Sequence, residues 1–191
     1  MVLGIDYVQS YLNDLSQIIE ALPKDTVVEI GNLLQEAREA DKHIFIMGNG
    51  GSAATASHIA GDFIKNSRNP GQKRVSIFAL NDNAPAVLSL SNDESYEVVY
   101  SEQLRSHARP GDLVIAISGS GNSPNVVNAV DAAKEMGLKT IGLTGFKGGK
   151  LKEKTDLCLV VPSDNMEMIE DAHMMVGHIL TDMMRGAAWG K

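Results

Sequence analysis

The residues best suited to chemistry in this chain lie in two short turns rich in glycine and serine. The first turn, GNGGSA at residues 48–53, follows an apolar segment and precedes a helical pattern. Glycines let the backbone approach a ligand and adopt positive φ, while a helix start presents unpaired N–H groups and a partial positive charge. This turn is therefore a candidate site for an anion.

The second turn, SGSGNSP at residues 118–124, strengthens that prediction. Ser123 suits the N-cap of a helix and Pro124 its first position, so three serine hydroxyls would surround the helix start. Hydroxyls and amides together suit a phosphate group. An ordinary capped loop is the alternative, but three serines interleaved with glycines exceed what capping requires. No P-loop lysine follows either turn, which disfavours nucleoside triphosphate hydrolysis.

A dinucleotide-dependent oxidoreductase is a competing interpretation of the first turn alone. GNGGSA matches the dinucleotide-binding pattern G-x-G-x-x-A, which by itself is a weak signal. That pattern calls for an acidic residue about 20 positions further on. The nearest such candidate, Asp82, lies 29 residues beyond Ala53, which argues against this interpretation.

Short apolar segments at regular intervals must position these turns. Five of them predict strands, at residues 43–47, 75–80, 113–118, 140–144 and 157–161. They are nearly continuously apolar, as strands are when helices cover both faces of a sheet. Helical patterns separate or connect them at residues 52–66, 83–90, 95–108 and 123–136. We therefore predict an α/β fold with a doubly wound, five-stranded parallel sheet flanked by helices.

Helices are also expected at both ends of the chain. Residues 7–21 and 24–40 predict an N-terminal helical hairpin joined at Pro23, and residues 165–185 predict a long helix rich in methionine. We interpret that last helix as a core or subunit-contact element. Residues 145–150 are predicted to form a flexible connection or a lid, and no linker divides the chain, so residues 1–191 are predicted to form a single domain.

Composition limits the partners and the compartment. The chain has 191 residues and a net charge of -7, which argues against nucleic-acid binding. Its one cysteine, Cys158, permits no internal disulfide and is consistent with a reducing compartment. No signal-peptide pattern and no apolar segment of membrane-spanning length occurs in the sequence, so we expect a cytoplasmic protein without a membrane partner.

Five segments together resemble the sugar isomerase (SIS) domain family, and within it the phosphoheptose isomerases. The resemblance extends over nearly the whole chain. It is carried by GNGGSAATASHIAGDF (48–63), SLSNDESYEVVYSEQL (89–104), AISGSGNSPNVVNAV (116–130), GLTGFKGGKL (142–151) and IEDAHMMVGHIL (169–180). The resemblance implies the SIS fold and a phosphorylated sugar as ligand.

The resemblance also implies where the sugar phosphate binds. The serines that would surround the phosphate are Ser52, Ser118, Ser120 and Ser123, in agreement with the independent interpretation of the turns. Further substrate-binding residues implied by the family are Asn49, Gly50, Gly51, Asp62, Asn92, Asp93, Gly119 and Glu170.

The reacting end of the sugar would meet a second set of side chains, His58, Asp62, Glu170 and His178. His58 and Asp62 are four residues apart and share a helix face, while Glu170 and His178 are about 80° apart around their helix. By similarity, Asp62 or Glu170 removes and returns the carbon-bound proton. His178 would move protons at oxygen or bind a metal. His173 is expected to be a packed or solvent-facing residue.

Two residues depart from the family pattern. Asp62 stands where the family typically has glutamate, and Glu170 stands where it has glutamine. The resemblance implies that one Zn²⁺ per subunit could be bound by His58, Asp62, Glu170 and His178. Which of the two carboxylates is the base stays open.

The implied reaction is the conversion of sedoheptulose 7-phosphate to D-glycero-D-manno-heptose 7-phosphate through an enediol. The family further implies a homotetramer with sites at subunit interfaces, in which residues 1–41 make oligomer contacts. The alternative is a non-catalytic SIS module that binds a sugar phosphate or a protein such as the replication initiator DnaA. Retention of the carboxylates and histidines argues against that alternative.

Overall fold

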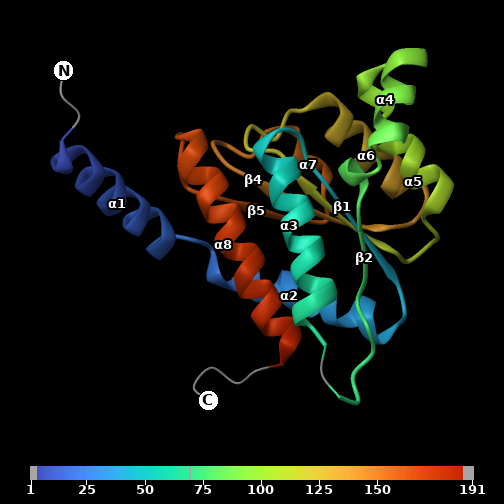
Figure 1. Ribbon diagram of the computed structural model, residues 1–191, viewed down its shortest axis with the longest axis horizontal. Coiled ribbons are helices and arrows are strands. Elements are labelled where there is room, and N and C mark those ends of the chain that lie inside the picture. Colours follow the sequence, from blue (N-terminus) through green and yellow to red (C-terminus); the bar gives the residue numbers. More distant parts are fainter. Residues whose placement is uncertain (1–3, 69, 187–191) are drawn as a thin grey trace.

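A five-stranded parallel sheet forms the centre of the molecule (Figure 1). The computed structural model describes residues 4–68 and 70–186. The strands are β1 His43–Met47, β2 Ser76–Ala79, β3 Leu113–Ile117, β4 Lys139–Thr144 and β5 Leu157–Val160. Their order is β2-β1-β3-β4-β5, and every neighbouring pair is parallel. The predicted doubly wound sheet is confirmed, with strand ends that differ by at most one residue.

Two layers of helices cover the sheet, and the side chains of β1 show how. Ile44 and Ile46 belong to a core shared with α2 (Lys24–Glu39), α3 (Gly51–Asn66) and α8 (Met166–Arg185). Phe45 and Met47 belong to a second core with α5 (Ser101–His107), α6 (Pro124–Glu135) and α7 (Gly149–Lys154). Alternate residues of a strand point to opposite faces, so both sets are buried.

Helices α3 and α8 lie side by side on one face of the sheet (Figure 1). Their close approach depends on Gly177 of α8, because a side chain at that position would overlap the side chain of Ile59 in α3. This packing brings residues that are more than a hundred positions apart in the sequence onto facing helix surfaces.

Three predicted segments differ from the structure, and one of them is the helix predicted at residues 83–90, which continues to Asp93. Residues 95–108 form a 3₁₀ turn, η2 (Tyr96–Val98), followed by the short helix α5. The break accompanies burial of Tyr100, whose hydroxyl donates to the carbonyl oxygen of Gly48. The segment predicted as a loop instead contains the start of α7, which begins after Gly148 in the left-handed region at φ 91°. The remaining short elements are η1 (Leu80–Asp82) and α4 (Ala84–Asp93).

Helix α1 (Ile5–Glu20) extends from the body as an arm (Figure 1). All sixteen of its residues are described, and none is buried. The hydroxyl of Tyr11 donates to Oδ2 of Asp171 in α8 at 2.8 Å. Both predicted N-terminal helices are thus present, but they do not form the predicted hairpin: α1 packs mainly on α8 and points away from α2 (Figure 1). Within the described part of the chain, no helix is both long enough and apolar enough to cross a membrane.

Candidate active site

The first glycine turn leads from β1 directly into α3. Gly50 adopts φ 53°, a left-handed conformation that favours glycine, and the amide of Ala53 then donates to the carbonyl oxygens of Asn49 and Gly50. Ser52 lies in the first helical turn and is buried. The turn therefore directs a helix N-terminus, with its partial positive charge, toward the carboxyl ends of the strands.

The second turn joins β3 to α6 and presents serine hydroxyls. Ser123 occupies the N-cap position before Pro124, but its side chain makes no capping hydrogen bond within the described chain. Its hydroxyl lies 3.0 Å from that of Ser118 instead, and the Ser120 hydroxyl accepts from the amide of Asn122 at 3.2 Å. The predicted helix start is confirmed, whereas the capping interaction predicted for Ser123 is replaced by a pair of hydroxyls.

An amide pair connects the two turns. Nδ2 of Asn49 donates to Oδ1 of Asn125 at 2.8 Å, and Nδ2 of Asn125 donates back to Oδ1 of Asn49 at 2.9 Å. The hydroxyl of Tyr96 also donates to Oδ1 of Asn49, and the hydroxyl of Tyr100, which donates to the Gly48 carbonyl oxygen, lies 3.2 Å from the same Oδ1. Burial is the main cause that raises the pKa of Tyr100, which keeps its hydroxyl protonated as a donor. No local pattern predicted Asn125, Tyr96 or Tyr100 as site residues, because their partner Asn49 lies on another element.

A cavity of about 280 Å³ opens between the two turns and the start of α8. It lies at the carboxyl ends of β1 and β3, where the strand order reverses, which is the usual position of ligand sites in open α/β sheets. Nine of the predicted substrate-binding residues line it: Asn49, Gly50, Gly51, Ser52, Ser118, Gly119, Ser120, Ser123 and Glu170. Ile117 and Met166 also line the cavity and were not predicted.

The other predicted substrate-binding residues lie elsewhere. Asn92 and Asp93 are exposed at the end of α4, where Nδ2 of Asn92 donates to Oδ1 of Asp93. Among the residues that the structure describes, neither lines the cavity. Asp62 lies further along α3, in the side-chain cluster described below.

Glu170 reaches the cavity from the second turn of α8. Its carboxylate lies directly against Gly51, so that any side chain at position 51 would overlap it. The first turn of α3 therefore combines a positive helix end with a neighbouring carboxylate. That arrangement leaves the serine turn as the more favourable half of the cavity for a ligand's own negative charge.

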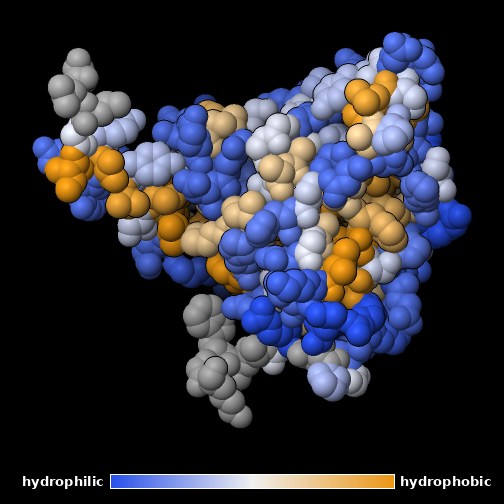
Figure 2. Space-filling view, in the orientation of Figure 1, coloured by the Kyte–Doolittle hydropathy of each residue, from blue (hydrophilic) through white to orange (hydrophobic). Residues whose placement is uncertain are grey.

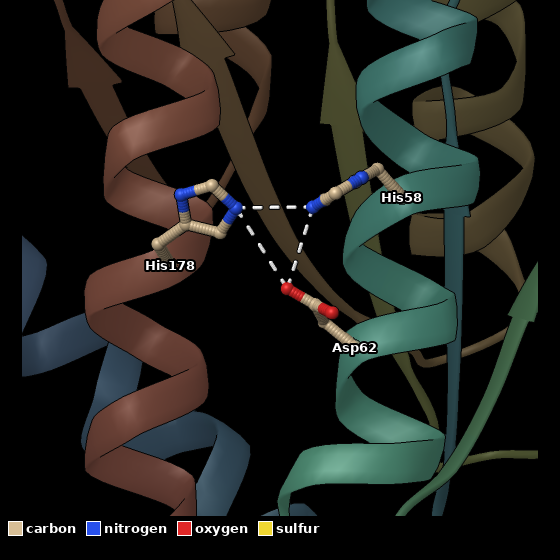
Figure 3. Close-up of side chains that lie close together, drawn as sticks. All are labelled: His58, Asp62 and His178. Carbon is tan, nitrogen blue, oxygen red and sulfur yellow. Dashed lines mark hydrogen bonds and ion pairs between the residues drawn. The ribbon is translucent and has the colours of Figure 1, made fainter.

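His58, Asp62 and His178 form a compact cluster between α3 and α8 (Figure 3). The two Nε2 atoms are 3.0 Å apart. Oδ2 of Asp62 lies 3.4 Å from Nε2 of His58 and 3.7 Å from Nε2 of His178. The histidine side chains are about half exposed, at 49% and 53%, so the cluster is open to a ligand.

The cluster fits a divalent metal. Tetrahedral zinc with bonds of about 2.0–2.1 Å holds its ligand atoms roughly 3.3 Å apart, close to the separations of these three atoms. Two imidazoles and one carboxylate are also a donor set that zinc accepts, with a fourth position left for substrate or water. Among the described residues, Glu170 is not part of this group, because its carboxylate lies at Gly51, about 12 Å along α8 from His178.

His173 lies on α8 between Glu170 and His178 and is only 1% exposed. Burial lowers the pKa of His173 from 6.5 to about 4, and the hydrogen bond with the carbonyl oxygen of Thr144 partly opposes that change. The imidazole is therefore neutral near pH 7. This agrees with the expectation of a packed residue.

The chain is similar to known proteins over most of its length. A family model described as the SIS domain matches residues 6–145 of the chain. A phosphoheptose isomerase from Trichlorobacter lovleyi is 38% identical over 178 residues, which cover 92% of this chain and 89% of the relative.

Solved structures agree with the sequence comparison. The structure of a phosphoheptose isomerase from Neisseria gonorrhoeae has a TM-score of 0.88 and 30% identity, and covers 95% of this chain and 98% of its own. That of a phosphoheptose isomerase from Francisella tularensis has a TM-score of 0.90 and 25% identity, with coverage of 97% and 100%. The similarity therefore concerns the whole fold and not one motif.

Proposed function

The chain belongs to the SIS domain family and, within it, to the phosphoheptose isomerases, and from this premise we propose that it interconverts sedoheptulose 7-phosphate and D-glycero-D-manno-heptose 7-phosphate. The observation that carries the proposal is the pairing of a serine-lined cavity with a carboxylate and imidazole cluster further along the same two helices.

The phosphate of the sugar binds at the serine turn. Ser118, Ser120 and Ser123 offer hydroxyls, and the start of α6 offers backbone N–H groups and a partial positive charge. Ser52 and the start of α3 form the opposite wall of the cavity. The carboxylate of Glu170 repels the phosphate and instead accepts hydrogen bonds from sugar hydroxyls.

The reacting carbons then extend toward the cluster. His58 follows Ser52 by six residues, which is about 9 Å along α3, so a ligand held by its phosphate places its opposite end near Asp62 and His178. Asp62 removes the proton from C1 of the ketose and returns it to C2 of the enediol. His178 transfers the proton between the two oxygens, because imidazole can both donate and accept near neutral pH.

Zinc fits the same cluster. His58, Asp62 and His178 would hold it, and when bound it would polarise the sugar carbonyl. The fourth ligand predicted from the family, Glu170, stays a prediction, because it lies with the cavity rather than with the other three side chains.

We also propose that the chain acts as a homotetramer whose sites lie at subunit interfaces. Helix α1 supports this, because its apolar residues Ile5, Val8 and Leu12 are 82%, 55% and 52% exposed and recur on one face. Figure 2 shows apolar side chains along this arm. The cytoplasmic location stays a prediction of the sequence.

Turnover of sedoheptulose 7-phosphate tests the function. The purified chain is incubated with the ketose, with zinc or with a chelator, and the aldose is followed by NMR. Asp62→Asn should lower kcat by about 10²–10⁴-fold, because an amide cannot accept the carbon-bound proton. Asp131→Asn is the matched control, since Asp131 pairs with Lys154 away from the site. No aldose from the wild type under either condition would refute the proposed function.

A further inference from the structure

One face of α8 packs onto the loops that form the cavity. Its residues recur every three or four positions and therefore share a side of the helix. Met166 packs against Gly119, Ile169 against Gly145 and Glu170 against Gly51, each so closely that a Cβ atom added to the glycine would overlap it. These contacts bring α8 near the loops, but van der Waals contacts have little directionality and do not by themselves fix the helix along its axis.

A buried hydrogen bond lies at the end of that face. Nε2 of His173 is 3.1 Å from the carbonyl oxygen of Thr144, the last residue of β4. Both residues are inaccessible or nearly so, with exposures of 1% and 0%. The next amide, that of Gly145, donates to the carbonyl oxygen of Gly119 at 2.8 Å. The hydrogen bond therefore links α8, through two residues of backbone, to the serine turn.

The chemistry of the imidazole identifies the donor. A carbonyl oxygen only accepts, so Nε2 must carry the proton and Nδ1 must be unprotonated. Nδ1 is buried and has no partner among the described residues. The low pKa of His173, about 4, agrees with this neutral form. An apolar side chain would fill the same space without burying an unpaired nitrogen. What the histidine adds is a directional hydrogen bond between α8 and Thr144, which packing alone does not provide.

We propose that His173 is a positioning residue for the isomerase site, which fixes α8 relative to the serine turn by donating its Nε2 proton to Thr144. Three residues before it, Glu170 is held against Gly51, and five residues after it, His178 is held opposite Asp62. The phosphate-binding end of the site and the reacting end are thereby kept at a fixed separation. This inference rests on the proposed function, since it concerns the alignment of one ligand between both ends.

Two nearly isosteric variants test the hydrogen bond. Methionine and glutamine have similar length and volume, but only glutamine carries an N–H donor. We expect His173→Met to lower kcat about tenfold or more, because small misplacements of reacting groups have large effects on rate. The inhibition constant for inorganic phosphate should stay within about threefold, because the serine turn is unchanged. His173→Gln should recover most of the lost kcat.

Arg38→Met provides the control for stability alone. Arg38 is also buried, and its Nη1 donates to the carbonyl oxygen of Met184 at the other end of α8. Assayed well below its melting temperature, this variant should keep kcat near the wild-type value. The inference is overturned if His173→Met keeps wild-type kcat, if Arg38→Met loses as much, or if His173→Gln does no better than methionine.

A measurement on the wild type covers the case in which His173→Met does not fold. In a ¹⁵N-histidine NMR spectrum, His173 should be the Nε2–H tautomer, and saturation with sedoheptulose 7-phosphate should shift its Nε2–H resonance. A resonance that does not respond to the bound sugar would overturn the inference. A wild type that neither binds nor converts the sugar would instead count against the proposed function.

Discussion

At the scale of single residues, the serine turn differs from an ordinary helix cap. Ser123 holds the N-cap position, yet its hydroxyl faces that of Ser118 and not a backbone amide of its own helix. A hydroxyl can rotate and exchange one partner for another. A phosphate oxygen can therefore replace the hydroxyl pair without disrupting the start of α6.

Alanine substitutions at the hydroxyl pair should weaken the binding of phosphate. We expect Ser118→Ala and Ser123→Ala each to raise KM for the sugar phosphate, and the inhibition constant of inorganic phosphate, about tenfold, because a hydrogen bond to a charged group contributes about 1.5–3 kcal/mol. Steady-state kinetics with phosphate as a competitor measures both values.

Ser106→Ala is the control for the serine variants, since Ser106 donates to Glu102 on the exposed side of α5. It should leave both constants unchanged. Unaltered constants in Ser118→Ala and Ser123→Ala would place the phosphate away from this turn.

At the scale of elements, glycines set how closely α8 approaches the cavity loops. Gly145 follows β4, and an added Cβ atom there would overlap the side chain of Ile169, which is fully buried. Closely packed interiors have little room to absorb such an atom. The short distance between α8 and the end of β4 therefore depends on the absence of a side chain at Gly145.

Adding that methyl group should destabilise the protein. Gly145→Ala is expected to lower the free energy of unfolding by about 1–3 kcal/mol, the usual effect of overpacking. Ile169→Ala removes the Cδ1, Cγ1 and Cγ2 atoms that the new Cβ would overlap, so the double variant should lose less than the sum of the two single variants. Denaturant unfolding at a fixed protein concentration measures the difference.

Gly61→Ala is the matched control for Gly145→Ala. Gly61 lies in the interior of α3, where an added Cβ atom would meet nothing within 4 Å. Because alanine favours helix over glycine, this change should stabilise the chain by about 0.5–1 kcal/mol. Equal losses in both variants would show that a general effect of alanine, and not the contact with Ile169, is responsible.

At the scale of the whole molecule, α1 is the helix least covered by the rest of the chain, and none of its residues is buried. The hydroxyl of Tyr11 in α1 donates a hydrogen bond to Asp171 in α8. This hydrogen bond is the main reason why the pKa of Tyr11 is raised to about 12. The tyrosine hydroxyl is therefore a proton donor across the physiological pH range. An exposed apolar stripe on an otherwise anchored helix is typical of a subunit contact.

Charges on the apolar stripe should break the oligomer. Val8→Glu combined with Leu12→Glu is expected to convert the proposed tetramer to smaller species in analytical ultracentrifugation, because burying two carboxylates is costly. The circular dichroism spectrum should stay near that of the wild type, since no described residue of α1 is buried.

Ser10→Glu combined with Gln17→Glu adds the same charge at exposed positions on the other side of α1 from the apolar stripe. These substitutions should leave the oligomer unchanged. If both double variants sediment like the wild type, α1 does not form the subunit contact.

The sequence by itself determined the order of elements and the positions of the two glycine turns. Strand composition and the spacing of turns depend on neighbouring residues, so β1 to β5 and both glycine turns could be predicted within one residue. Pro124 marked the start of α6 for the same reason. The sequence pattern was least informative where a helix is interrupted. Residues 95–108 were predicted as one helix, and their division into η2 and α5 could not be predicted because it depends on the burial of Tyr100.

Only the tertiary structure decided which side chains meet. The approach of His58 to His178, the pairing of Asn49 with Asn125 and the position of Glu170 at Gly51 all join residues from different elements. Sequence periodicity gives the face of a helix on which a side chain lies, but the distance between two faces depends on how closely the elements pack and in what register. For that reason the four predicted metal ligands separate into a cluster of three and a carboxylate that belongs to the cavity.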